Sequence, residues 1–214
     1  MRPLLVFDLD GTLIDGYRGI ADALSYAMGR LGLTPPSDQR VRVMVGYGLE
    51  RLVEQAVGQK LAPEGVRLFR ERYPLVAVEG SRLMPGVAET LPLLEDRGHP
   101  MAVASNKPAR FSKLILEAKG VARHFFAIEG PDAQTPAKPD PAMLRRILER
   151  GRAPAATTWV IGDMEVDAQF GRAAGCRVVL IPSGSRTREE LSAVPNDGLL
   201  GAIAELPAWL DSAG

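Results

Sequence analysis

The sequence predicts an α/β protein whose parallel sheet carries an inserted all-helical module. Three observations predict this fold class. Short β-branched and aliphatic runs recur along the chain, patterns with helical spacing lie between them, and one long stretch contains helical patterns alone. Strands that alternate with helices favour a parallel sheet, because each helix carries the chain back to the start of the next strand.

Five short apolar runs are predicted to form the buried strands of this sheet. They are Leu4 to Phe7, Met101 to Ala104, Phe125 to Ile128, Thr158 to Ile161 and Arg177 to Ile181. Two helical patterns between them each place one apolar stripe against the sheet, namely Phe111, Leu114, Ile115 and Ala118, then Met143, Leu144, Ile147 and Leu148. The tail from Arg186 onward is expected to be helical in part.

The exception to the alternation is the stretch 18–80, which contains helical patterns and no convincing strand. Its clearest helical face comprises Ile20, Ala23, Leu24, Ala27, Met28 and Leu31. The stretch begins after the first strand and its turn, and it ends at Pro85-Gly86, where a new helix is predicted. We therefore expect a helical cap at 15–82, inserted by short linkers that let it move, and a core formed by 1–14 and 83–214.

Composition excludes several classes of function. Of the 214 residues, 26 are basic and 26 acidic, with no long run of either sign, so neither a nucleic acid nor a membrane surface is expected as a partner. The single cysteine, Cys176, excludes an internal disulfide and a multi-cysteine metal site, and it is expected to be buried. No apolar run approaches a membrane span. We expect a soluble, cytoplasmic monomer or homodimer.

Acidic residues follow the first and fourth predicted strands. Ligands of open parallel sheets bind beyond the carboxyl ends of the strands, so these positions are candidate site residues. Asp8 and Asp10 follow the first strand, and the alternation of side chains sends both in the same direction, while Gly11 permits a tight turn. Asp163 and Asp167 follow the fourth strand. The sequence thus predicts a cluster of carboxylates at one edge of the sheet.

Candidate phosphate-binding groups lie in two other segments. Ser105 and Asn106 follow the second strand where a helix is predicted to start, and we expect them both to cap that helix and to bind phosphate. Lys138 lies in a turn stiffened by Pro139 and Pro141 that opens another helix. Glu165 and Asp140 are interpreted as first-turn acids, and His99 and His124 follow no metal-ligand spacing.

Together these residues supply what phosphoryl transfer through a carboxylate requires: a nucleophile, a proton donor, hard oxygen ligands and positive charge. Magnesium prefers a few carboxylates plus water and substrate phosphate, and Asp8, Asp163 and Asp167 would provide the carboxylates. Asp10 would be the general acid that protonates the leaving oxygen and the base that later activates water.

The segments DLDGTL, Ser105-Asn106, Lys138 in KPDP and GDMEVD resemble, in this order, the four motifs of the haloacid dehalogenase superfamily of phosphatases. The resemblance implies a Rossmann-like three-layer core with strand order 3-2-1-4-5 and a phosphorylated Asp8. It also implies Asp10 as acid and base, and Mg²⁺ held by Asp8, the carbonyl of Asp10 and the acids of the last motif.

A finer resemblance concerns the cap. Val45-Gly46-Tyr47-Gly48, Pro85-Gly86-Val87, Ser105-Asn106-Lys107-Pro108 and Ala173-Ala174-Gly175-Cys176 are similar to segments of the phosphoglycolate phosphatase group. The helical C1-type cap of that group is inserted where 15–82 lies. The resemblance implies Mg²⁺-dependent hydrolysis of a small phosphorylated metabolite like phosphoglycolate. The polar and aromatic residues near its substrate-facing regions are Tyr17, Arg18, Tyr47 and Arg51.

Two departures from the family pattern stand out. A small hydroxyl residue often follows Gly-Asp in the last motif, whereas this chain has Met164, which is expected to alter hydrogen bonding around the metal ligands. The turn after the first motif reads Asp15-Gly16-Tyr17-Arg18-Gly19, without the usual serine and proline.

Other functions use similar residues. Within the superfamily the alternatives are a pyrophosphatase, a nucleotidase, a sugar-phosphate mutase and a dehalogenase, the last of which needs no acid at Asp10. A phosphoacceptor signalling domain also uses an aspartate, Mg²⁺, a hydroxyl residue and a lysine, but it needs neither a cap nor a second aspartate. A non-catalytic binding protein would tolerate loss of Asp8 or Asp10, and this chain keeps both.

Overall fold

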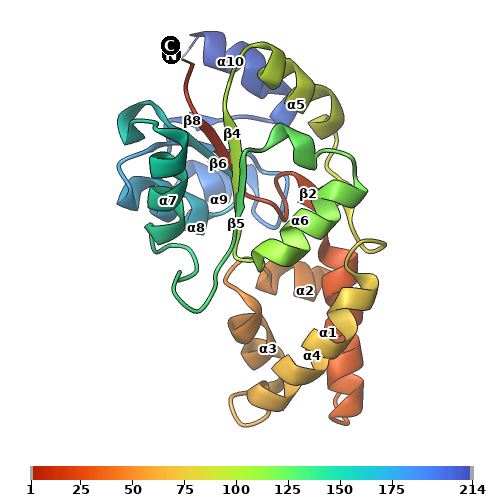
Figure 1. Cartoon of the computed structure of the whole chain (residues 1–214). Helices are drawn as coiled ribbons and strands as arrows, with labels where there is room; N and C mark the ends of the chain where they lie inside the picture. Colours follow the sequence, from red (N-terminus) through yellow and green to blue (C-terminus); the bar gives the residue numbers. More distant parts are fainter. Residues whose placement is uncertain (1, 213–214) are drawn as a thin grey trace.

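A six-stranded parallel sheet forms the centre of the core in the computed structural model, which describes residues 2–212 (Figure 1). The strand order is β5-β4-β1-β6-β7-β8. The strands are β1 (Leu5–Phe7), β4 (Met101–Ala104), β5 (Ala127–Glu129), β6 (Trp159–Gly162), β7 (Arg177–Leu180) and β8 (Gly198–Leu199). The five predicted strands and their 3-2-1-4-5 order are confirmed. The edge strand β8 was not predicted, because two residues carry no readable periodicity.

The central strand β1 is buried on both faces. It pairs with β4 and β6, and Val6 lies opposite Ala102 and Val160. Leu5 and Phe7 pack on one side of the sheet, with α5 (Val87–Asp96), α6 (Ala109–Ala118) and α10 (Leu206–Ser212). Val6 packs on the other side, with α7 (Ala142–Gly151) and α8 (Glu165–Ala173). Helices thus cover both faces, which confirms the three-layer core.

The remaining core elements are short. Helix α9 (Arg188–Ser192) packs beside α8 through Leu191. Three 3₁₀ turns connect larger elements, η1 (Ala122–His124), η2 (Ala155–Thr157) and η3 (Ile203–Glu205). Cys176 is buried as predicted. Within residues 2–212, every helix is too short or too polar to cross a bilayer.

The helical insertion lies between β1 and β4, and it extends from the core as a separate lobe (Figure 1). It contains α1 (Tyr17–Arg30), α2 (Asp38–Met44), α3 (Leu49–Val57) and α4 (Ala62–Val76). The predicted face of α1 is buried from Ile20 to Met28, and Leu31 at its end is partly buried. The predicted all-helical module is therefore confirmed.

The two connections between the insertion and the core run side by side. β2 (Ile14–Asp15) and β3 (Arg82–Leu83) form an antiparallel pair in which Ile14 lies opposite Leu83. A carboxylate oxygen of Asp15 also lies 2.8 Å from the Arg82 guanidinium. The division into a core of 1–14 and 83–214 and a cap of 15–82 stays a prediction.

Candidate active site

Three predicted acids meet at the carboxyl edge of the sheet. Asp8 follows β1, Asp163 follows β6, and Asp167 lies in the first turn of α8. One carboxylate oxygen from each lies within 4.8 Å of the others. Adjacent parallel strands end at the same edge, so residues more than 150 positions apart in the chain come together there.

The Asp163 carboxylate is buried and only half satisfied. Its Oδ1 accepts a hydrogen bond from the Thr12 hydroxyl at 3.2 Å, while its Oδ2 has no partner among the described residues. Burial, followed by the charges of Asp8 and Asp167, raises the pKa of Asp163 well above its usual range. A Cβ at Gly184 would overlap Oδ2, so this close approach of the backbone requires glycine. A carboxylate oxygen that lacks a partner and lies among three carboxylates is a suitable ligand for a hard divalent cation.

Lys138 supplies the positive charge of the cluster. Its Nζ lies 2.7 Å from Asp8 Oδ1 and 2.8 Å from Asp167 Oδ1, and the side chain is buried. Burial disfavours the charged amine, but the carboxylates of Asp167 and Asp8 outweigh it and raise the pKa of Lys138. The lysine therefore stays protonated beside Asp8.

Asp167 has two partners. Its Oδ1 accepts from Lys138, and its Oδ2 accepts from the backbone N–H of Met164 at 3.1 Å, which caps α8. Burial raises the pKa of Asp167 to about 6, although the charge of Lys138 opposes the shift. The helix-capping role and the position in the acid cluster are thus compatible.

Asn106 and Ser105 line the same pocket but do not cap the following helix. Asn106 Oδ1 accepts from the Lys138 backbone N–H at 2.7 Å, and its Nδ2 donates to the Gly46 carbonyl of the cap at 2.9 Å. Ser105 Oγ accepts from the Lys107 backbone N–H at 3.2 Å. Helix α6 begins only at Ala109, without a side-chain cap. The capping prediction is wrong because two further residues precede the helix and both side chains bond elsewhere.

Asp10 forms a buried ion pair that was not predicted. Its carboxylate lies 2.7 Å from Lys107 Nζ, and both side chains are largely buried. Burial raises the pKa of Asp10, and Lys107 opposes this shift. Lys107 directly follows Ser105-Asn106 in the sequence. This position next to two predicted site residues could have identified Lys107 as a candidate site residue.

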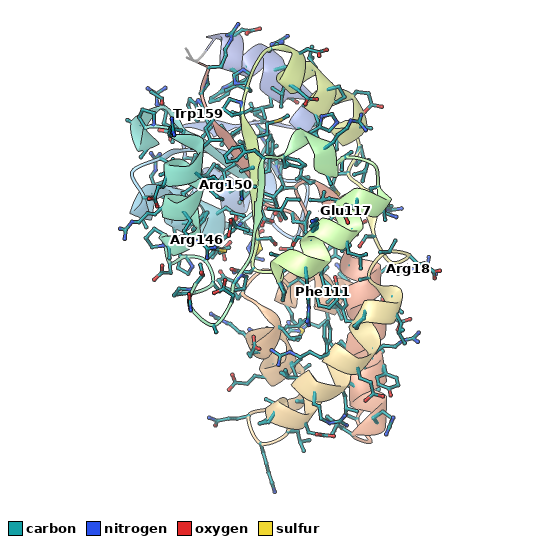
Figure 2. The ribbon with its side chains drawn as sticks, viewed as in Figure 1. Arg18, Phe111, Glu117, Arg146, Arg150 and Trp159 are labelled. Carbon is teal, nitrogen blue, oxygen red and sulfur yellow. The ribbon has the colours of Figure 1, made fainter. Side chains whose placement is uncertain are left out.

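The predicted cap residues lie in different places. Tyr17 is buried near the acid cluster, and the Arg42 guanidinium lies 4.1 Å above its ring. Burial, then the charge of Asp163, raises the pKa of Tyr17. Arg18 is exposed and points outward, so the structure does not bring it to the site (Figure 2).

Tyr47 and Arg51 contribute to the outer contact between cap and core. The Tyr47 hydroxyl donates to Glu165, and Arg51 covers the Tyr47 ring at 4.4 Å. Glu165 is also paired with Arg186 at 2.8 Å. Glu165, interpreted from sequence as a first-turn acid, is therefore also a partner of the cap.

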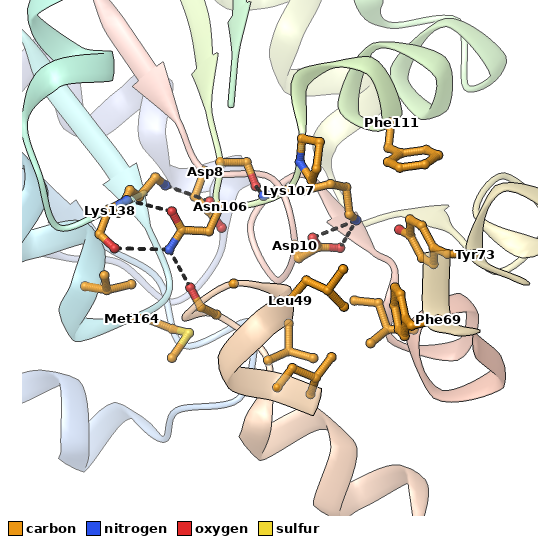
Figure 3. Close-up of a pocket in the computed structure, with 18 of the residues that line it drawn as sticks. Asp8, Asp10, Leu49, Phe69, Tyr73, Asn106, Lys107, Phe111, Lys138 and Met164 are labelled. Carbon is orange, nitrogen blue, oxygen red and sulfur yellow. Dashed lines mark hydrogen bonds and ion pairs between the residues drawn. The ribbon is translucent and has the colours of Figure 1, made fainter. Parts of the chain in front are cut away.

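A pocket of about 100 Å³ lies between cap and core (Figure 3). Its polar end is formed by Asp8, Asp10, Asn106, Lys138 and Asp167. Much of the remaining wall is apolar and comes from Ile20, Leu49, Leu52, Phe69, Tyr73 and Phe111. Sequence reasoning missed these residues, because an apolar helix face facing a pocket has the same pattern as one facing a core.

Met164 packs against the cap. It is 3% exposed, it lines the pocket, and a Cβ at Gly46 would overlap its sulfur. Gly46 has φ +128°, a backbone conformation that favours glycine. In place of a small hydroxyl residue, the chain thus has an apolar side chain under a cap loop whose carbonyl binds Asn106.

An α/β core with a helical insertion and a lysine among buried carboxylates is the architecture of a class of phosphoryl-transfer hydrolases. The chain belongs to the haloacid dehalogenase-like hydrolases, whose family model matches residues 5–181. The protein is 33% identical to the phosphoglycolate phosphatase of Vibrio parahaemolyticus, over 95% of this chain and 93% of that one. It is 31% identical to the probable phosphatase IndB of Dickeya dadantii, over 96% and 92%.

Solved structures agree with this assignment. A predicted phosphoglycolate phosphatase from Haemophilus somnus superposes with a TM-score of 0.87 at 26% identity, covering 97% of each chain. A haloacid dehalogenase-like hydrolase from Streptococcus pneumoniae has a TM-score of 0.90 at 22% identity, covering 97% of this chain and 98% of that one. The second likeness concerns the fold alone.

Proposed function

We propose that this hydrolase is a Mg²⁺-dependent phosphatase that removes phosphate from a small metabolite of the phosphoglycolate kind through a phosphorylated Asp8. The observation that carries the proposal is the Asp8 carboxylate at the end of β1, held 2.7 Å from Lys138 and within a group of carboxylates that includes an orphaned oxygen. The phosphoglycolate phosphatases among its relatives support the substrate class.

The carboxylates of Asp8, Asp163 and Asp167 and the backbone carbonyl of Asp10 would hold Mg²⁺. The fit follows from the hard oxygen donors and from the unpaired Asp163 Oδ2. When bound, the cation would offset the negative charge of the carboxylates and of the substrate phosphate.

In the first step Asp8 attacks phosphorus. A bond forms between an Asp8 carboxylate oxygen and phosphorus, the ester P–O bond breaks, and Asp10 transfers its proton to the departing alkoxide. Lys138 orients Asp8 and offers positive charge to the equatorial phosphate oxygens, and Ser105, Asn106 and nearby backbone N–H groups would donate hydrogen bonds to them. The buried Lys138, which cannot move far, is suited to this positioning role.

In the second step Asp10 acts as the base. It takes a proton from a water molecule whose oxygen attacks phosphorus, and the Asp8–phosphate bond breaks to release inorganic phosphate. The 15–82 cap would limit the access of other water and select the leaving alcohol. This division of roles requires two aspartates on one side of β1, which Asp8 and Asp10 supply.

We also propose a cytoplasmic location, supported by the single buried thiol of Cys176. The assembly as a monomer or homodimer stays a prediction. The pyrophosphatase, nucleotidase and mutase alternatives use the same aspartates, so only substrate profiles separate them from the proposal.

The test is phosphate release from phosphoglycolate, pyrophosphate, nucleotides and sugar phosphates, with Mg²⁺ or with chelator. We expect selective, Mg²⁺-dependent release that Asp8→Asn abolishes. Asp10→Asn should slow turnover severely and leave Mg²⁺ affinity largely intact. Asp96→Asn, which changes an exposed aspartate of α5, is the matched control and should leave turnover unchanged. Substantial activity in Asp8→Asn would contradict the mechanism, and equal turnover of unrelated esters would contradict the substrate class.

A further inference from the structure

The pocket continues beyond Asp10 into a group of aromatic residues that the proposed mechanism does not use. Phe69 and Tyr73 come from α4 of the cap, and Phe111 comes from α6 of the core. The Tyr73 ring stacks on Phe69 at 5.2 Å and meets Phe111 edge to face at 5.1 Å. Lys107 Nζ lies 5.7 Å from the centre of the Tyr73 ring. We call these four residues the leaving-group subsite.

The position of this subsite follows from Figure 3. Asp8, Asn106 and Lys138 lie at one end of the pocket, Asp10 and Lys107 lie in the middle, and the aromatic rings lie at the other end. A phosphate bound at Asp8 would direct its ester oxygen toward Asp10, so the alcohol would extend toward the rings. The subsite is therefore positioned to hold the leaving alcohol.

Two polar groups in the subsite are available to a ligand. The Tyr73 hydroxyl is buried and lines the pocket, and no hydrogen bond of normal geometry satisfies it among the described residues, although the Lys107 ammonium lies close to it. The Lys107 ammonium carries three donors and binds the Asp10 carboxylate, with Nζ 2.7 Å from its oxygens. Leaving a buried hydroxyl unpaired is unfavourable, so an acceptor group on the ligand would bind strongly there.

Much of the surrounding wall is apolar. Ile20 of α1, Leu49 and Leu52 of α3, and the rings of Phe69 and Phe111 line the pocket, and the side chains of Arg70 and Arg110 add positive charge to the lining. Glycolate offers them a single methylene group. A larger carbon skeleton would cover more of this wall, and each buried apolar group favours binding.

Given the proposed function, we infer that the leaving-group subsite recognises phosphorylated 2-hydroxy acids whose side chain is larger than that of glycolate. The carboxylate of the alcohol accepts hydrogen bonds from the Tyr73 hydroxyl and Lys107 Nζ. Its apolar side chain packs against Phe69, Phe111 and the aliphatic wall. Lys107 is then shared between Asp10 and the substrate.

The experiment compares kcat/KM for four esters: ethyl phosphate, phosphoglycolate, 2-phospholactate and the phosphate ester of 3-phenyllactate. We expect the two larger hydroxy-acid esters to exceed phosphoglycolate several-fold, and ethyl phosphate to be the poorest substrate. Tyr73→Phe should lower kcat/KM about tenfold for the three carboxylate esters and leave ethyl phosphate unchanged. Tyr26→Phe alters a cap tyrosine whose hydroxyl binds the exposed Glu71, and it should change none of the values.

A second variant tests the apolar wall. Phe69→Leu keeps an apolar side chain of similar bulk and should reduce the advantage of the phenyllactate ester over phosphoglycolate. The assignment is overturned if phosphoglycolate is the best of the four, or if Tyr73→Phe affects ethyl phosphate as strongly as the carboxylate esters.

Acetyl phosphate separates failure of the subsite from failure of the proposed function. Its leaving group, acetate, is not a 2-hydroxy acid and needs no proton from Asp10, so its Mg²⁺-dependent hydrolysis reports on Asp8 and the phosphate-binding residues and not on the subsite. Turnover of acetyl phosphate without the expected order of esters would reject the subsite and retain the phosphatase. If the wild-type protein hydrolyses neither acetyl phosphate nor any ester, the proposed function is wrong and the subsite assignment falls with it.

Discussion

The Nδ2 atom of Asn106 donates a hydrogen bond to the carbonyl oxygen of Gly46 at 2.9 Å, which joins the core to the cap at the pocket that Asp8 and Asp167 also line. The same side chain accepts a hydrogen bond from the Lys138 backbone through Oδ1. One residue therefore contacts both the cap loop and the turn that presents the lysine. The position of the cap loop and the placement of Lys138 are linked through this amide.

We predict that Asn106→Ala lowers kcat/KM about tenfold, because both backbone groups lose a partner and each unpaired group costs about 1–3 kcal/mol when buried. Steady-state kinetics with phosphoglycolate checks this. Asn196→Ala is the matched control: Asn196 Nδ2 donates to the Val194 carbonyl in the core, away from the pocket, so kcat/KM should stay at the wild-type value. An unchanged kcat/KM in Asn106→Ala would remove the link between cap and lysine.

Replacing Lys138 by methionine should destabilise the protein by about 3–5 kcal/mol, as is typical when one partner of a buried ion pair is removed. Asp8 and Asp167 would then face each other without the ammonium group that lies between them. Urea unfolding at pH 7 in chelator measures the effect. The exposed Lys60→Met serves as control and should change stability by less than about 0.5 kcal/mol. A similar free energy of unfolding in both variants would contradict this prediction.

The metal-free protein should lose stability as pH rises from about 4 to beyond 6. The pKa of Asp167 is raised to about 6 in the folded protein, and the pKa of Asp163 is raised as well. An acid whose pKa is higher in the folded protein than in the unfolded chain stabilises the fold in its protonated form. This stabilisation is complete at a pH below the pKa of the unfolded chain, and it is lost as the pH rises through the pKa of the folded protein. For Asp167 the change is roughly 3 kcal/mol.

Thermal unfolding from pH 4 to pH 8, with chelator or with Mg²⁺, checks this pH dependence. We expect the increase in Tm that Mg²⁺ produces to grow with pH, because the ionised carboxylates bind the cation and need its charge. The Asp163→Asn variant should show a smaller increase. A Mg²⁺ effect independent of pH would contradict the assignment of these acids.

Gly46→Ala should lower kcat/KM, because its Cβ would overlap the Met164 sulfur, so that the buried Met164 side chain must repack or the cap loop must move away from the core. The matched control is Gly58→Ala in the same cap, which also has a positive φ, of +79°, but has no atom within 4 Å of the added Cβ. Both variants carry backbone strain, and only the first crowds Met164. Adding Met164→Ala to Gly46→Ala should restore part of the activity. Equal losses in the two single glycine variants would show that strain alone matters.

Much of the fold was predictable because it depends on local patterns. The runs at Leu4 to Phe7 and Met101 to Ala104 are continuous and apolar, as strands buried on both faces must be, and β1 and β4 lie there. The stripe from Ile20 to Met28 marks α1 for the same reason. The two-residue strands β2, β3 and β8 were missed, because no period can be read from two residues.

Some residues of the candidate site were likewise predictable from local sequence, and others were not. Asp8, Asp163 and Lys138 could be named from their order along the chain and their places after strands or before helices. The expectation that Ser105 and Asn106 cap α6 failed, because their hydrogen-bond partners lie in the Lys107 backbone, in the cap and in the Lys138 turn. No local pattern reveals such distant partners.

The sequence by itself determined the α/β architecture, the position of the insertion and the edge of the sheet at which the acids gather. These depend on periodicities of two and 3.6 residues and on the rule that neighbouring parallel strands end together. Only the tertiary structure decided which groups touch: Asp10 with Lys107, Gly46 with Asn106 and Met164, and the unpaired Tyr73 hydroxyl with an apolar wall. Such contacts depend on how the cap sits on the core, and interactions between residues far apart in the chain govern that placement.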